Sequence, residues 1–168
     1  CGLRCAILDR LLFVSQSTLM IEIYVDADAC PVKYEIVRVA DRHNLRVNMV
    51  SNGGIRPNQH PLVTTVIVDS GPDAADNWIA DRIRNGDIAI TNDIPLAALC
   101  IENGANVIRP NGDVLNKQTI GGILATRNLM TNLRAAGEVF GGPKPFGSKD
   151  RSKFLDYLER TVQAAKRC

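Results

Sequence analysis

The segment 21–31, IEIYVDADACP, places two aspartates directly after a short apolar run. Runs of this kind are typical of strands that are buried on both faces of a parallel sheet. Pro31 then fits the first turn of a helix, where the N–H group that proline lacks would have no helical partner. Ligands of open α/β sheets bind beside the carboxyl ends of the strands. Asp26 is therefore predicted to stand at the functional edge of such a sheet.

The same alternation of apolar run and helical segment continues along the chain. Strands are predicted for 21–26, 45–50, 64–69, 87–91 and 105–108, and helices for 32–43, 72–84, 94–102, 119–136 and 151–165. Strands that alternate with helices in this way indicate a mainly parallel sheet joined by right-handed crossovers. The predicted fold class is a single-domain α/β protein, a three-layer sandwich with additional C-terminal helices.

The predicted domain covers residues 20–165, and residues 1–19 are expected to be an extension outside it. The apolar run in this extension is interrupted by Asp9 and Arg10, which argues against a signal peptide. No apolar run approaches the roughly 20 residues of a spanning helix, so no membrane partner is expected. Five cysteines without paired spacing favour a reducing, cytoplasmic compartment, with Cys30 and Cys100 as buried residues.

Charge is distributed unevenly along the chain. Residues 20–116 contain 8 Lys/Arg against 13 Asp/Glu, whereas residues 117–168 contain 10 against 4. Such asymmetry is typical of proteins with a surface for a polyanion such as RNA, and it is equally explained by attraction between the two parts of the chain. The sequence is also compatible with a homo-oligomer.

Carboxylates follow three of the predicted strands. Because the carboxyl ends of parallel strands lie along one edge, these carboxylates are expected to meet there, where two charges 4 Å apart repel by about 4 kcal/mol at an effective dielectric of 20. A divalent cation with oxygen ligands, Mg²⁺ or Mn²⁺, would remove that repulsion. Taken singly, Asp73 and Asp93 are better explained as helix N-caps, and only the convergence of three strand ends favours a metal site. The predicted metal ligands are Asp26, Asp28, Asp73, Asp76 and Asp93.

A second group of candidate residues is basic. Arg127, Thr131 and Arg134 are spaced to share one face of the predicted helix 119–136, and further basic residues follow in a glycine-rich loop. The guanidinium group matches the geometry of phosphate, although a solvated helix face and an unstructured loop explain the same residues. The candidates for contact with a substrate phosphate are Arg127, Arg134, Lys144 and Arg151.

Several motifs resemble the YaiI/YqxD family of bacterial proteins. They are DADACP at 26–31, GPDAADNWI at 71–79, TNDIPLA at 91–97, TRNLMTNLRAAG at 126–137, and GGPKPF at 141–146 with Asp150-Arg151. The resemblance runs in order from Met20 to about Glu159. It implies a PIN-like fold, whose better-known members are metal-dependent nucleases that act mainly on RNA.

The resemblance also implies roles for individual residues. In the PIN pattern an aspartate ends the first strand, an acidic residue lies in a central helix and an aspartate follows a later strand. By that pattern Asp26, Asp76 and Asp93 are the catalytic metal ligands, with Asp28 and Asp73 in support. The two arginines of helix 119–136 match the family and not the superfamily, so the resemblance implies no role for them.

Three functions are compatible with these observations. The first is a Mg²⁺- or Mn²⁺-dependent phosphodiesterase acting on RNA, in which the metal activates water. The second is a non-catalytic domain that binds RNA or a protein. The third is a phosphatase of the haloacid dehalogenase type, with Asp26 as nucleophile and Asp28 as acid. It is disfavoured because no lysine and no adjacent acidic pair occur between Val50 and Arg109.

Overall fold

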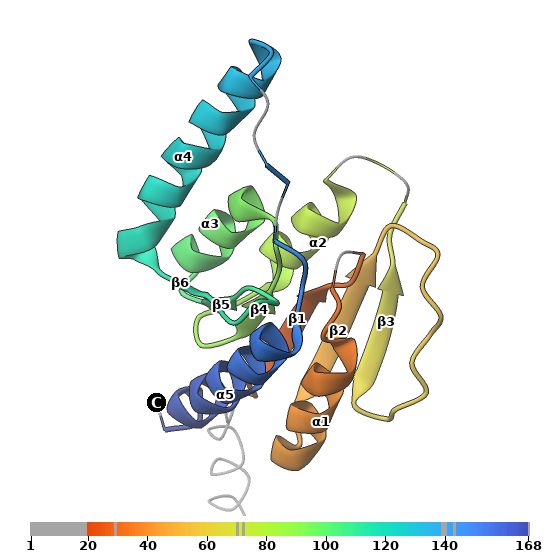
Figure 1. The fold of residues 1–168 in the computed structure, drawn as a ribbon. Coiled ribbons are helices and arrows are strands. Elements are labelled where there is room, and N and C mark those ends of the chain that lie inside the picture. The colour runs from red at the N-terminus through yellow and green to blue at the C-terminus, as the bar shows by residue number, and fades with distance from the viewer. Residues whose placement is uncertain are drawn as a thin grey trace, which may run out of the picture.

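A six-stranded sheet forms the centre of the protein in the computed structural model (Figure 1). The structure describes residues 20–28, 30–69, 71, 73–138, 141–142 and 144–167, so the predicted extension 1–19 lies outside the described residues. The strands are β1 (Glu22–Asp26), β2 (Arg46–Ser51), β3 (Val63–Ile67), β4 (Ile88–Ile90), β5 (Asn106–Ile108) and β6 (Val114–Leu115). Their order is β3-β2-β1-β4-β5-β6, and every neighbouring pair is parallel except β5 and β6.

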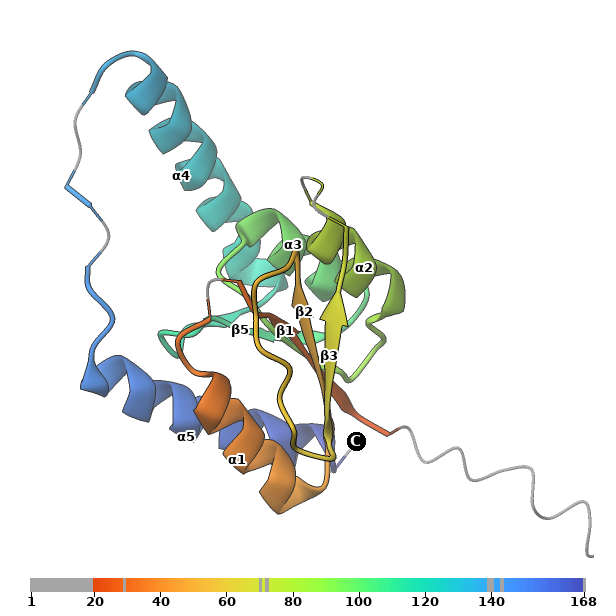
Figure 2. The same cartoon turned by 90° about the vertical axis from the view of Figure 1, so that its right-hand side faces the viewer.

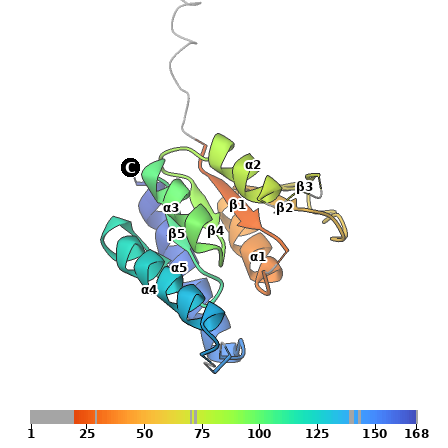
Figure 3. The ribbon, with the colours of Figure 1, turned by 90° about the horizontal axis from the view of Figure 1, so that it is seen from above.

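Helices cover both faces of this sheet (Figure 3). The helices are α1 (Lys33–His43), α2 (Ala74–Arg82), α3 (Ile94–Glu102), α4 (Lys117–Ala135) and α5 (Ser148–Ala165). One face packs against α1 and α5, and the other against α2, α3 and the first half of α4. The arrangement confirms the predicted three-layer α/β sandwich with a mainly parallel sheet. None of the described helices is both long and apolar enough to cross a membrane.

Side chains of the central strand alternate between the two apolar cores. Ile23 and Val25 are fully buried on the side of α1 and α5, whereas Tyr24 packs on the side of α2 and α3. This alternation is the ordinary geometry of a strand, and burial on both faces explains why the segment is apolar throughout. Cys30 and Cys100 are buried free thiols, as predicted. The strand therefore holds Asp26 rigidly at its end.

The hairpin between β5 and β6 was not predicted as a strand pair. Two backbone hydrogen bonds close its turn at Pro110–Gly112, one of them from Arg109 N–H to the Asp113 carbonyl at 2.8 Å. Gly112 has a φ of +85°, and a Cβ there would lie 2.8 Å from the backbone nitrogen of Phe154. The hairpin is thus pressed against α5 at a point where only glycine fits.

Helix α4 extends away from the rest of the domain (Figures 1 and 2). It begins with a capping box between Asn116 and Thr119, and Ile120, Ile123 and Leu124 pack partly against the core beside α3. Further apolar side chains continue along the helix beyond them, but none of its residues is fully buried, and Leu129 is 55% exposed. The helix predicted for 119–136 is therefore present, with most of its length exposed.

Candidate functional site

The carboxyl ends of β1 and β4 bring Asp26 and Asp93 together. The two strands are neighbours, with Val25 opposite Ile90, so that Asp26 ends one strand and Asp93 follows the other. Buried Thr91 joins them: its hydroxyl donates to Asp26 Oδ2 at 3.1 Å and accepts from the Asp93 backbone N–H at 2.9 Å. The structure therefore connects two aspartates that are 67 residues apart in sequence through one hydroxyl group.

Asp93 also begins α3. Its Oδ1 accepts a hydrogen bond from the Leu96 N–H at 2.9 Å, which is the N-cap interaction. The alternative structural role considered for this residue is thus present. Capping engages Oδ1, and among the described residues Oδ2 has no hydrogen-bond partner. The cap fixes the side chain at the sheet edge and leaves one oxygen for another ligand.

Asp76 lies in the first turn of α2 and faces the same cluster. Its pKa is raised to about 6, first by burial and then by the negative charges of Asp93, Asp26 and Asp73. The pKa of Asp26 is also raised, mainly by burial, while the hydrogen bond from Thr91 opposes this shift. Because the charge of Asp93 raises the pKa of both Asp26 and Asp76, the three groups share one electrostatic environment.

The two supporting aspartates lie at the margin of this cluster. Asp28 is exposed, and both of its carboxylate oxygens are engaged: Ser51 Oγ donates to one and the Asn52 N–H donates to the other at 3.0 Å. Asp73 occupies the N-cap position of α2 with a φ of +60° and makes no capping hydrogen bond. The structure thus gives Asp28 partners within the chain and leaves Asp73 exposed beside Asp76.

The donor set of the cluster fits a hard cation, but its spacing is wider than a closed site. Asp26, Asp76 and Asp93 offer only oxygen ligands, as Mg²⁺ and Mn²⁺ prefer. Within the described part of the chain, no three His, Cys, Asp or Glu side chains stand close enough together to hold a metal ion. A cation bound here would have to draw the carboxylates nearer to one another.

Replacing Asp76 with asparagine is expected to stabilise the metal-free protein at neutral pH. The raised pKa means that the ionised carboxylate opposes folding, and after allowance for its partial exposure the gain is about 1 kcal/mol. Since the folded pKa of Asp76 lies above its unfolded value, the stability difference should be full above pH 6 and vanish as the pH falls towards 4. Chemical unfolding in EDTA across this range measures it.

Asp81, an exposed carboxylate on the same helix, supplies the matched control. An Asp81→Asn variant should change the free energy of unfolding at neutral pH far less than Asp76→Asn does. A stability loss in Asp76→Asn at neutral pH would contradict the electrostatic description of the cluster.

The predicted phosphate-binding residues fall into different surroundings. Arg127 and Arg134 are exposed on α4. Arg151 ion-pairs with the buried carboxylate of Glu35, and its guanidinium lies 5.6 Å from the centre of the Phe146 ring. Lys144 lines a pocket that also contains Asp28. Lys144 therefore shares a pocket with Asp28 at the margin of the acidic cluster, whereas the structure gives Arg151 an internal partner.

Two residues of this edge were missed by the sequence analysis. Thr91 could have been suspected from its place at the end of a predicted strand, but threonine is common in strands and gives no signal of its own. Arg109 follows β5 at the same carboxyl edge, in the segment IRPNG. A lone arginine before a turn is ordinary surface composition, so only the fold shows that it lies near the aspartates.

Comparisons with known proteins match nearly the whole domain. A family model described as "Uncharacterized BCR, YaiI/YqxD family" matches residues 24–164. A UPF0178 protein from Roseobacter denitrificans is 58% identical over 147 residues, which cover 87% of this chain and 97% of that protein. A UPF0178 protein from Ruegeria pomeroyi is 58% identical over 150 residues, covering 88% and 97%. One from Azorhizobium caulinodans is 54% identical over 147 residues, covering 88% and 92%. No solved structure matches.

Proposed function

Because the chain belongs to the YaiI/YqxD family, as its motifs predicted, we propose its function from its own site: a Mg²⁺- or Mn²⁺-dependent phosphodiesterase that cleaves RNA. One observation carries the proposal. Asp26 and Asp93 meet at the carboxyl edge of neighbouring strands, connected through Thr91, and Asp76 faces them from α2.

The chemistry follows from the charge of this cluster. Three carboxylates in a partly buried environment repel one another, and a divalent cation converts the repulsion into attraction. Bound there, such a cation would activate water and stabilise the charge that develops on a phosphate. Asp26, Asp76 and Asp93 would hold it, and the Thr91 hydroxyl would keep Asp26 oriented. The positions of these acidic residues agree with the PIN pattern described above.

The spacing of the carboxylates favours one alternative. Because no three acidic groups of the described residues converge on a single point, a non-catalytic RNA- or protein-binding domain agrees with the same side chains. The phosphatase has less support, because its acid would be Asp28, whose two carboxylate oxygens are held by Ser51 and Asn52. The nuclease proposal explains why three carboxylates are gathered at this edge, whereas a non-catalytic binding domain does not require them.

The proposal is tested with the purified full chain and a labelled single-stranded RNA. We expect cleavage in Mn²⁺ or Mg²⁺ and none in EDTA, together with Mn²⁺ binding detected by electron paramagnetic resonance. Salt-sensitive RNA binding with neither Mn²⁺ binding nor cleavage would support the non-catalytic alternative. An acid-stable phosphorylated protein formed from a phosphomonoester would support the phosphatase.

A further inference from the structure

A pocket of about 840 Å³ opens beside the acidic cluster. We call it the edge pocket and define it by Asp28, Pro31, Asn92, Arg109, Lys144 and Phe146, which contribute to its lining. Asn92 lies between Thr91 and Asp93, so the wall of the pocket is continuous with the chain that carries the cluster. Its volume is within the range of pockets that hold small ligands.

The acidic groups of the edge pocket are already engaged by the protein. Asp28 accepts from Ser51 and Asn52, as described above. Asp150, which also lines the pocket, accepts from the Gly147 N–H at 2.9 Å and so caps α5. These neutral donors hold both carboxylates in place, and among the described residues neither Asp28 nor Asp150 forms an ion pair with a basic group of the pocket.

The basic groups are much less engaged. Among the described residues, Lys144 has neither an ion pair nor a hydrogen-bond partner for its ammonium group. Arg109 reaches Asp113 only at 4.0 Å, and its buried Nε has no hydrogen-bond partner among the described residues. A buried donor without a partner is costly and calls for an explanation.

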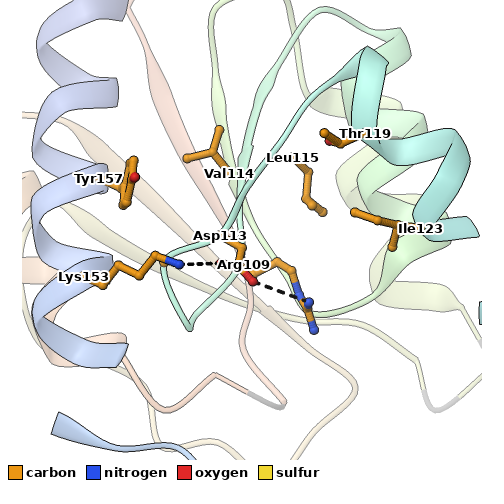
Figure 4. Close-up of a pocket in the computed structure, with 9 residues that line it drawn as sticks. Arg109, Asp113, Val114, Leu115, Thr119, Ile123, Lys153 and Tyr157 are labelled. Atoms are coloured by element: carbon orange, nitrogen blue, oxygen red, sulfur yellow. Dashed lines mark hydrogen bonds and ion pairs between the residues drawn. The ribbon is translucent and has the colours of Figure 1, made fainter. Parts of the chain in front are cut away.

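The carboxylate nearest to Arg109 is held by another cation. Lys153 Nζ lies 2.6 Å from Asp113 Oδ1, and Asn111 donates to the other oxygen at 2.8 Å. Figure 4, which shows the adjoining pocket, places Lys153 and Arg109 on opposite sides of Asp113. These partners lower the pKa of Asp113, with the hydrogen bond from Lys153 as the largest cause. Arg109 is therefore a weaker partner of Asp113 than Lys153 is, and its guanidinium group remains able to pair with an anionic ligand.

Part of the remaining wall of the edge pocket is apolar and includes an aromatic ring. Pro31, Pro110 and Phe146 contribute this surface, and Phe146 remains 37% exposed although the Arg151 guanidinium lies 5.6 Å from the centre of its ring. Exposed aromatic rings beside cations are the usual platform for a nucleotide, whose base stacks while its phosphate pairs with the charge. The pocket therefore combines two kinds of contact that no simple anion requires.

We propose that the edge pocket binds one unpaired nucleotide, with its phosphate at Arg109 and Lys144 and its base against Phe146. In the context of the proposed function, on which this role rests, the nucleotide neighbours the phosphate that is cleaved. A base inside a duplex is stacked and paired and cannot enter, so the pocket selects single strands. A nucleotide at the end of an RNA chain and one within the chain both offer a base and a phosphate, so either could occupy the pocket.

Binding is measured in EDTA, where metal-dependent cleavage cannot occur, by fluorescence anisotropy of a labelled single-stranded RNA. We expect Arg109→Gln and Lys144→Gln each to weaken binding ~10-fold, as loss of a charge-assisted hydrogen bond would. Phe146→Leu should weaken it ~5-fold through lost stacking. Lys149→Gln removes an equal charge from α5 outside the pocket lining and should change affinity less than 2-fold, in the manner of a peripheral phosphate contact.

Competitors and RNA ends define the ligand further. A nucleoside 5′-monophosphate should displace the RNA better than inorganic phosphate does, and a duplex of the same sequence should bind wild type and Lys144→Gln equally. If a 5′-phosphate strengthens binding and the strengthening disappears in Lys144→Gln, the bound nucleotide is terminal. Equal binding of RNA with a 5′-phosphate or a 5′-hydroxyl identifies an internal one.

The pocket and the proposed activity can fail separately. Equal losses of RNA affinity in Lys144→Gln and Lys149→Gln would overturn the proposed nucleotide pocket. RNA would then be attracted by the overall positive charge of this surface and not by the pocket. Wild-type affinity in both Arg109→Gln and Lys144→Gln would do the same, even if the protein cleaves RNA. Pocket-dependent binding without cleavage in Mn²⁺ would refute the phosphodiesterase and keep the pocket. Lys144 is exposed in a loop, so its variant remains informative if Arg109→Gln does not fold.

Discussion

Asparagine in place of Asp26 is expected to lower the rate of Mn²⁺-dependent RNA cleavage by more than ~100-fold. Asp26 is the terminal residue of the central strand and the cluster member that accepts from Thr91. Asparagine keeps the shape and an oxygen for this hydrogen bond but removes the charge that would hold a divalent cation. The ratio of initial cleavage rates, at equal protein and Mn²⁺ concentrations, measures the loss.

The same variant should fold at least as well as wild type in the absence of metal. Burial raises the pKa of Asp26, so its ionised form opposes folding at neutral pH and the neutral amide does not. Mn²⁺ should raise the melting temperature of wild type, because it binds only the folded state, and should raise that of Asp26→Asn far less. A stable but inactive variant separates a ligand role from a structural one.

Asp69→Asn is the matched control for this experiment. Asp69 is an exposed aspartate that follows β3, at the same edge of the sheet but on its outermost strand. Its variant should cleave RNA and respond to Mn²⁺ as wild type does. Equal cleavage by Asp26→Asn and wild type would mean that the cluster is not the catalytic site, or that the activity belongs to a contaminating nuclease. Cleavage by a mock preparation from host cells that lack the protein identifies the latter.

The parts of this fold that follow from sequence are those decided by local pattern. Alternating apolar runs and helical segments predicted the parallel sheet, and the position of Asp26 after such a run placed it at the carboxyl edge. Adjacency of β1 and β4 was not predictable in the same way, because strand order depends on pairing between distant segments. That Asp26 and Asp93 lie close together was therefore only a hypothesis until the strand order was known.

Features that depend on a distant partner were not predictable. Arg151 was predicted to contact a substrate phosphate as one of the basic residues of the glycine-rich loop, and this stays a prediction. Its ion pair with Glu35, which lies 116 residues earlier in the sequence, could not be foreseen. Likewise, helical spacing showed which side chains of α4 share a face and not whether another element covers that face. Helix α5 begins at Ser148 rather than at 151, since Asp150 accepts from the Gly147 N–H.

Replacing Arg151 with methionine is expected to destabilise the protein by ~2 kcal/mol, which corresponds to a fall in melting temperature of ~4–8 °C. The Glu35 side chain is only 5% exposed and its Oε2 has no hydrogen-bond partner among the described residues, so removing Arg151 leaves a buried charge unpaired. The value is below that of a fully buried pair because the Arg151 side chain is 46% exposed. Thermal and chemical unfolding measure it.

A double-mutant cycle separates this structural role from contact with RNA. If Arg151 acts by neutralising Glu35, the added Glu35→Gln substitution should restore much of the stability lost in Arg151→Met, because it removes the unpaired charge. RNA affinity, measured well below the melting temperature, should then change little in either Arg151→Met or the double variant. A large loss of RNA affinity in both Arg151→Met and the double variant, with stability restored in the double variant, would contradict a purely structural role. Arg151 would then contact a substrate phosphate, as the sequence predicted.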